Sequence, residues 1–269
     1  MTRGAVKRWL VIPDAHVPYH DRAAWSCVLQ AIKIIKPDGF LNLGDFVEAE
    51  SVSHWQWKKK KRPPLDYQLK EINTEIGIVN GYWDEIDAVL RQAKVREKVY
   101  VQGNHDEWFD RLVEENPHLE RTVHANGCGY LFKDAFSLSD RGYRFIPLGE
   151  PFRVGKLYFY HGHHCRSALN HARWHVLNKG VNLCYGHWHD VQEYSISHIE
   201  GQKAAWSIGC LKSFKYEDAN QWTGRRSLNW SHAFAVVDFW DDGKFTVHVV
   251  RIINGKCSLW GDIINGNGK

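Results

Sequence analysis

Five short motifs rich in Asp, Asn, His and Gly each follow a short apolar run, and they constrain the fold of this chain more than any other feature. A short apolar run that stops at polar residues predicts a buried strand. Open α/β sheets place their functional sites in loops after the carboxyl ends of their strands. We therefore expect the five loops to lie together. The motifs are Asp14-Ala-His16, Gly44-Asp45, Gly103-Asn-His-Asp106, His161-Gly-His163 and Gly186-His-Trp-His189.

Taken singly, each motif has an ordinary structural explanation. An Asp at a strand end can cap a turn beside a surface histidine, a Gly-Asp pair is common in turns, and loop histidines are often partly exposed. The motifs become informative as an ordered set, because all five occur where a predicted strand ends. The set therefore indicates a shared site.

The first hundred residues alternate between strand and helix patterns. Asp21 suits the N-cap of the first helix, and the second helix has apolar residues at alternating steps of three and four, which places them on one face. This order predicts parallel strands covered by helices. The expected strands are 9–13, 39–44 and 98–101, and the expected helices are 21–35 and 66–91.

The second half of the chain has fewer helix patterns. We expect a helix at 167–177 and, because few helices separate the strands, antiparallel pairing among them. No internal repeat, linker or break in composition divides the sequence, so we expect a single domain spanning residues 1–269 with two sheets. The expected strands are 156–160, 182–185, 204–208, 233–239 and 244–252.

Composition excludes several classes of protein. The chain has 269 residues, of which 43% are hydrophobic and 25% charged, as is usual for a globular protein. The formal net charge of +4 permits a phosphate-rich partner without requiring one. Six cysteines without a CxxC pair favour free thiols in a reducing compartment. The apolar run 9–12 is too short for a signal peptide, and no run is long enough for a membrane helix, so we expect a cytoplasmic protein with no membrane partner.

The donor atoms in the motifs are suited to divalent metal ions. Carboxylate, imidazole and amide oxygen are ligands of Mn²⁺, Fe and Zn²⁺. Cysteine is absent from the motifs, which disfavours a structural zinc knuckle. We expect two divalent metal ions, with Mn²⁺ first and Fe, Zn, Ni, Co or Mg as alternatives, because an oxygen and nitrogen donor set accepts all of them.

The ordered set DxH, GD, GNHD, HGH and GHxH, which spans residues 14–189, resembles the calcineurin-like metallophosphoesterase superfamily, and within it the uncharacterised phosphoesterases of phage and bacterial genomes. The resemblance implies an α/β fold, a four-layer α/β/β/α sandwich with two mixed β-sheets. It also implies that one metal is held by Asp14, His16 and His189. The other metal would be held by Asn104, His161 and His187, with Asp45 bridging the two.

The resemblance further implies a dinuclear phosphoester hydrolase in which a hydroxide between the metals attacks phosphorus and His105 assists the leaving group. Asp106 would orient His105 or a ligand, or it would simply cap the following helix. Phosphoprotein phosphatases of the family carry GDxVDRG, whereas Glu48 stands here at the position of the second Asp and the Arg is missing. This departure disfavours a Ser/Thr phosphatase and leaves open whether Glu48 supports His105.

The segment 54–62, HWQWKKKKR, combines basic residues with tryptophans. Such a segment suits a nucleic-acid backbone with stacked bases, although a solvated loop has the same composition. We also expect substrate contacts from His54, His163, His164 and Arg166, and positive surface from His171, Arg173 and His175. We therefore favour a phosphodiesterase acting on DNA or RNA, that is, a nuclease, which could be phage-encoded and act in the host cytoplasm. The alternatives are a phosphomonoesterase for nucleotides or phosphoproteins, and a non-catalytic nucleic-acid-binding accessory protein.

Overall fold

The computed structural model describes residues 6–53, 61, 63–122, 129–165, 169–215, 217–224 and 228–268. In this part of the chain, the first large sheet has the strand order β11-β10-β1-β2-β3-β4. Strands β1 to β4 are parallel, whereas β10 and β11 are antiparallel to their neighbours. The strands are β1 Lys7–Ile12, β2 Gly39–Asn42, β3 Glu97–Val101, β4 Arg144–Ile146, β10 Ala233–Phe239 and β11 Phe245–Arg251.

The second large sheet has the order β5-β6-β7-β9-β8. Our prediction of antiparallel pairing in this half is wrong for its centre, since β6, β7 and β9 are parallel. The reason is that a helix crosses over between β6 and β7, and such crossovers join parallel strands. The strands are β5 Phe152–Val154, β6 Leu157–Tyr160, β7 Asn182–Tyr185, β8 Val191–Ile196 and β9 Lys203–Ile208.

The three helices that the sequence predicts with bounds begin and end close to the expected positions. Asp21 caps the first helix, as predicted, and its side chain accepts a hydrogen bond from the backbone N–H of Ala24 at 2.8 Å. The fifth helix begins at His171, later than the expected start at residue 167. The helices are α1 Arg22–Ile35, α2 Leu65–Gln92, α3 Glu107–Glu115, α4 Phe132–Ala135 and α5 His171–Lys179, and the short 3₁₀ helices are η1 Glu50–Val52, η3 Pro117–Arg121, η4 Gln221–Thr223 and η5 Asp241–Gly243.

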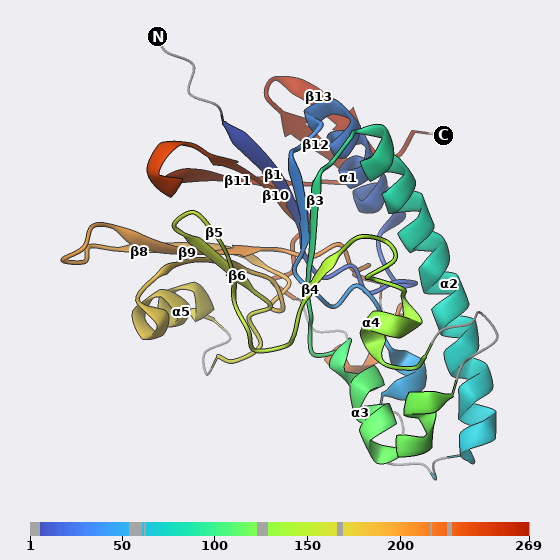
Figure 1. Ribbon diagram of the computed structural model, residues 1–269. Helices are drawn as coiled ribbons and strands as arrows, with labels where there is room; N and C mark the ends of the chain where they lie inside the picture. The colour runs from blue at the N-terminus through green and yellow to red at the C-terminus, as the bar shows by residue number, and fades with distance from the viewer. Residues whose placement is uncertain are drawn as a thin grey trace.

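The elements form four layers, which confirms the predicted sandwich with two mixed sheets (Figure 1). Alternate residues of β1 face opposite sides of the first sheet. Leu10 and Ile12 pack with the cluster that contains α1 and α2, whereas Trp9 and Val11 pack into a second cluster shared by both sheets. On the far side, α5 covers the second sheet. The two sheets therefore bury one face against each other and the other face against helices.

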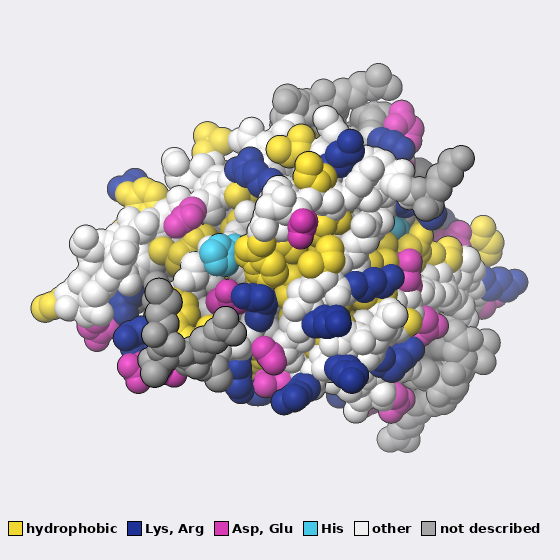
Figure 2. Space-filling model, turned by 90° about the horizontal axis from the view of Figure 1, so that it is seen from above, with side chains coloured by type: hydrophobic (Ala, Val, Ile, Leu, Met, Phe, Trp, Pro, Cys, Tyr) yellow, Lys and Arg dark blue, Asp and Glu magenta, His cyan; other side chains and the backbone are white. Residues whose placement is uncertain are grey.

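A third, two-stranded sheet lies beyond the large ones. Strands β12 Lys256–Leu259 and β13 Asp262–Asn265 form an antiparallel hairpin that contacts α1 and was not predicted. In the view from above, hydrophobic side chains gather among lysines and arginines (Figure 2). In this hairpin Trp260 is 53% exposed, and Arg8, near the start of β1, lies over its ring at 4.2 Å from the centroid. Trp260 is thus at the end of β1 opposite to the first motif.

No helix in the described residues combines the length and apolar character needed to cross a membrane. Among the described residues, the structure has free thiols at Cys27, Cys184, Cys210 and Cys257, as expected.

Candidate metal centre

The five motif loops converge at the carboxyl ends of their strands. Asp14 and His16 follow β1, Asp45 follows β2, the Gly103–Asp106 loop follows β3, and the last two motifs follow β6 and β7. Backbone hydrogen bonds link the loops in pairs, from the N–H of His16 to the carbonyl of Asp45 and from the N–H of Gly186 to the carbonyl of His161, each at 3.0 Å. The predicted clustering of the motifs is therefore observed.

The first cluster contains Asp14, His16 and His189, the three residues expected to share one metal. Nε2 of His16 lies 3.1 Å from Nε2 of His189, which in turn lies 3.7 Å from Oδ1 of Asp14. All three side chains are buried, and their potential ligand atoms lie within 4.8 Å of one another. This group can hold a cation.

The second cluster contains Asn104, His161 and His187. Nε2 of His161 lies 3.0 Å from Oδ1 of Asn104 and 3.3 Å from Nδ1 of His187. Nδ1 of His161 donates to the carbonyl of Leu43 at 2.8 Å, which directs its Nε2 toward the cluster. This group also offers nitrogen and oxygen donors that suit a divalent ion.

Asp45 lies between the two clusters. Its Oδ2 is 3.2 Å from Nε2 of His161 and 3.9 Å from Nε2 of His16, whereas its Oδ1 accepts a hydrogen bond from the backbone N–H of His105 at 2.8 Å. One carboxylate oxygen therefore faces donors of both clusters. The residues present fit a pair of divalent ions that share one carboxylate.

Four of these residues adopt backbone conformations that are uncommon for side chains larger than glycine. The φ angles are positive at His16 (53°), Asp45 (48°), His187 (69°) and His189 (63°). A non-glycine residue in this region costs on the order of 1–3 kcal/mol, and such residues concentrate at functional sites. The strain supports the assignment of these loops to a binding site.

Two motif glycines allow the carboxylates to come close to the backbone. A Cβ atom at Gly103 would overlap Oδ1 of Asp45, and a Cβ atom at Gly186 would overlap Oδ2 of Asp14. These glycines therefore make room for the carboxylates that would hold the metal ions.

Burial and charge perturb the titration of the cluster. Burial raises the pKa of Asp14 to about 7, and the negative charge of Asp45 adds to the rise. Burial alone would lower the pKa of His161, but the carboxylate of Asp45 raises it to about 10. Burial lowers the pKa of His16 to about 4, and the charge of Lys212 acts in the same direction. Buried carboxylates of this kind are stabilised by a cation.

His105 lies beside the clusters on the wall of a cavity. Its Nδ1 is 2.6 Å from the backbone carbonyl of Glu48, and since a carbonyl only accepts, Nδ1 carries the proton. The ring packs against Trp108 at 4.2 Å between centroids and meets His16 edge-on at 4.7 Å. These contacts fix the ring and leave Nε2 as the atom available for proton transfer.

The carboxylate of Glu48 supports His16 instead of His105. Its Oε2 lies 2.7 Å from Nδ1 of His16 and 2.6 Å from Nζ of Lys212, and only its backbone carbonyl contacts His105. The departure from GDxVDRG left open whether Glu48 supports His105, and the structure shows that its carboxylate does not. Lys212 is 2% exposed and was missed by the sequence reasoning, because it belongs to no motif and lysines are mostly exposed.

Asp106 orients a ligand loop. Its Oδ2 accepts hydrogen bonds from the backbone N–H groups of Gly103 (2.7 Å) and Asp45 (3.0 Å) and from the hydroxyl of Tyr100 (2.7 Å). It stands at the N-cap of α3, but its side chain makes no capping bond there. It does not contact His105 through any of these bonds, so its position fits support of Asp45 and not proton transfer.

The predicted substrate contacts are less clustered than the ligands. His54 and Arg166 lie outside the described residues. His163 is half-buried with its ring 6.0 Å from that of His161, and His164 is exposed. Neither lines the cavity beside the clusters.

The expectation that His171 and His175 add positive surface is wrong. Both side chains are fully buried, where His171 contacts Tyr185 and His175 contacts Tyr160. The helix pattern of α5 did not reveal which of its faces the second sheet would cover.

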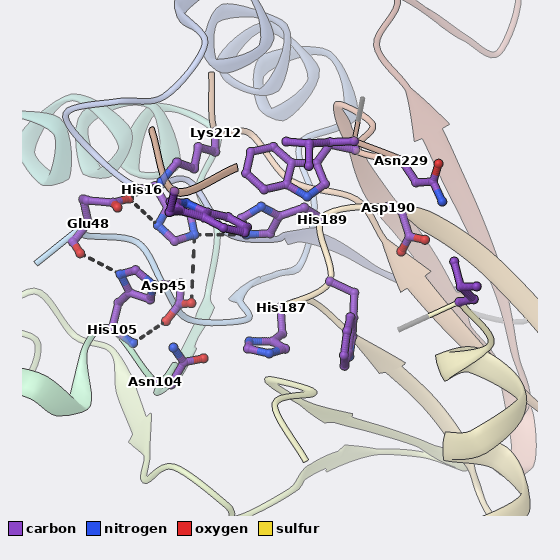
Figure 3. Close-up of a pocket in the computed structure, with 15 residues that line it drawn as sticks. His16, Asp45, Glu48, Asn104, His105, His187, His189, Asp190, Lys212 and Asn229 are labelled. Carbon is purple, nitrogen blue, oxygen red and sulfur yellow. Dashed lines mark hydrogen bonds and ion pairs between the residues drawn. The ribbon is translucent and has the colours of Figure 1, made fainter. Parts of the chain in front are cut away.

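The cavity has a volume of about 640 Å³, within the range of ligand pockets. Figure 3 shows Glu48 and His105 on one side of His189, and Asp190 and Asn229 on the other. The sequence reasoning missed the part of this cavity that lies on the side of His189 away from His105. Its lining includes Trp188, Asp190, Trp222, Asn229 and Trp230.

In its ordered motifs and its four-layer fold, the chain resembles the calcineurin-like metallophosphoesterases. No family model matches it. Two curated proteins match over nearly their whole length: the Gene 54 protein of Mycobacterium phage L5, 23% identical over 273 residues, and the Gene 54 protein of Mycobacterium phage D29, 24% identical over 274 residues. Each match covers 96% of this chain and 98% of the relative.

Similar solved structures include Vps29 of Entamoeba histolytica complexed with zinc, with 15% identity, a TM-score of 0.47 and coverage of 97% of this chain and 99% of that one. Vps29 of Chaetomium thermophilum has 13% identity, a TM-score of 0.43 and coverage of 96% and 97%. These values are too low to transfer an activity to this chain.

Proposed function

We propose that this chain is a phosphoester hydrolase that depends on two divalent metal ions. The observation that carries the proposal is the position of Asp45, whose Oδ2 faces His16 of the first cluster and His161 of the second. A shared carboxylate is the means by which two-metal hydrolases hold their ions close together. The fully formed donor set disfavours the alternative of a non-catalytic nucleic-acid-binding protein.

Each group of residues has a distinct task in this proposal. Asp14, His16 and His189 would hold one ion, and Asn104, His161 and His187 the other, with Asp45 between them. The bound ions would lower the pKa of a coordinated water and neutralise charge on the phosphate. We assign to His105 the transfer of a proton from Nε2 to the leaving oxygen, while the carbonyl of Glu48 holds Nδ1.

Among metals we favour Mn²⁺, with Fe, Zn, Ni, Co and Mg as alternatives, because the donors are oxygen and nitrogen. Among substrates we favour a phosphodiester, with nucleic acid as the partner, over a phosphomonoester of a nucleotide or phosphoprotein. The basic segment 54–62 motivates this preference, and apart from Lys61 it lies outside the described residues. Because the curated relatives are phage proteins, we also propose that the chain acts in the cytoplasm of an infected host.

The test compares hydrolysis of bis(p-nitrophenyl) phosphate and p-nitrophenyl phosphate in Mn²⁺. We expect the wild type to cleave the diester and Asp45→Ala to abolish cleavage, whereas Asp66→Ala, at an exposed position in α2, serves as the matched control. Cleavage of the monoester alone would refute the diesterase preference. A wild type inactive on both substrates in every divalent metal would refute the hydrolase.

A further inference from the structure

We infer that the cavity beside the metal centre contains a binding site for the nucleobase of a nucleotide phosphoester. This site, the aromatic subsite, consists of Trp188, Asp190, Trp222, Asn229 and Trp230, which line the same cavity as His105 and Asp45. The inference rests on the proposed function, because it names the substrate class that the same cavity would accept.

The aromatic subsite adjoins the first metal cluster. Trp188 and Asp190 flank His189 directly in the sequence. The ring of Trp230 lies 4.5 Å from the ring of His189, and the N–H of Ser231 donates to the carbonyl of His189 at 2.8 Å. Asp190 and Asn229 lie on the side of His189 away from His105 (Figure 3). A group attached to a phosphate at the metals would therefore reach this subsite.

The tryptophans present aromatic surface to the cavity. Trp222 is 65% exposed, and its ring lies 6.1 Å from that of Trp230 with an angle of 48° between the planes. Trp188 is held in place, because its Nε1 donates to the carbonyl of Gly162 at 3.2 Å and its ring stacks on His171 at 5.0 Å and 11°. Exposed rings in a cavity are suited to stacking on bases, since every base has a π-face.

The polar groups of the subsite favour a base over a second phosphate. Asp190 is fixed by His171, whose Nε2 lies 2.7 Å from Oδ1, and by Gln192, whose Nε2 donates to Oδ2 at 2.8 Å. A carboxylate repels phosphate but accepts hydrogen bonds from the N–H groups of a base. The carboxamide of Asn229 offers a donor and an acceptor together, the pattern that base edges present.

The first test uses two diesters with the same leaving group, thymidine 5′-(p-nitrophenyl phosphate) and methyl p-nitrophenyl phosphate. The measured quantity is the ratio of their kcat/KM values, the nucleoside preference. We expect Trp222→Leu to lower this ratio about tenfold, the order expected for one lost base–aromatic stack. Trp222→Phe should retain most of it. Trp260→Leu, a similarly exposed tryptophan at the far end of β1, should leave it unchanged.

The outcomes separate this inference from the proposed function. A wild type that cleaves both diesters without nucleoside preference, or a preference that Trp222→Leu leaves intact, overturns the aromatic subsite while the hydrolase stands. A wild type that cleaves neither diester in any divalent metal overturns the hydrolase.

The second test measures binding without activity. Saturation-transfer-difference NMR of adenosine with the metal-free protein should label the base protons more strongly than the ribose protons. Trp222→Leu should weaken this transfer and Trp260→Leu should retain it, with circular dichroism confirming that both variants fold. Transfer to methyl glucoside as strong as to adenosine would assign the rings to sugar binding and overturn the inference.

Discussion

At the scale of single residues, His105 is the group whose proposed task is most distinct from metal binding. Its Nδ1 donates to the carbonyl of Glu48, which leaves Nε2 for a leaving oxygen. We predict that His105→Gln lowers kcat about 10²- to 10⁴-fold for diesters with poor leaving groups and much less for activated ones. The measurement is kcat against the pKa of the leaving alcohol. A uniform loss together with loss of metal would instead place His105 among the ligands.

The buried pair of Lys212 and Glu48 makes a second prediction at this scale. Burial alone would raise the pKa of Glu48, but His16 and Lys212 lower it to about 2. Lys212→Met removes one buried partner, so the free energy of unfolding should fall by about 3 kcal/mol or more. Glu48→Gln in the same chain should recover part of the loss, which urea denaturation of the single and double variants measures. If the double variant loses the sum of the stabilities lost by the two single variants, Lys212 and Glu48 do not interact as proposed.

At the scale of elements, the loops after the strands depend on glycines that leave room for carboxylates. Gly186→Ala would push Asp14 away from His16 and His189, because a Cβ atom overlaps Oδ2 of Asp14. We predict that this variant binds fewer metal ions per chain, measured by elemental analysis after dialysis. Gly81→Ala, in α2 with nothing near its added Cβ, is the control and should be more stable by about 0.5–1 kcal/mol. Full metal content in Gly186→Ala would contradict the assignment of Asp14.

Helix α2 carries a buried carboxyl group whose titration should affect stability. Burial raises the pKa of Glu75, although it accepts hydrogen bonds from the N–H groups of Glu50 and Ser51 and from the Ser51 hydroxyl. Because the pKa of Glu75 is higher in the folded state, its neutral form stabilises the fold relative to the ionised form. This stabilisation is fully present below the unfolded pKa of about 4.3 and is lost as the pH rises through the folded pKa.

We predict that the advantage of the wild type over Glu75→Gln, measured as the free energy of unfolding in urea, declines from pH 4 to pH 8. Glu71→Gln serves as the exposed control on the same helix. An advantage that grows with pH would contradict the assigned direction.

Elements with strong patterns could be predicted from the sequence, and others could not. The long apolar face of α2 and the continuous apolar run of β10 mark buried structure without any knowledge of partners. No residue of strand β8 is buried, and the strands of the β12–β13 hairpin have only four residues each, so the sequence signal of these elements is weak. Parallel pairing of β7 with β9 depends on which neighbours meet in space, and this information is not local.

At the scale of the whole molecule, the site is assembled from both sheets. The ligand motifs could be read from the sequence because chemistry restricts metal ligands to a few residue types. Lys212 and Trp222 could not be found in this way, since residues outside any motif acquire a role only when the fold brings them to the cavity. The same reasoning explains why the placement of Glu48 against His16 required the structure.

The proposed centre consists of two ions held around Asp45. Anomalous scattering from crystals grown with Mn²⁺ measures their number and positions. We predict two peaks about 3.5–4 Å apart, one among Asp14, His16 and His189, the other among Asn104, His161 and His187, with Asp45 contacting both. A single peak, or two peaks that Asp45 does not join, would contradict the proposed centre.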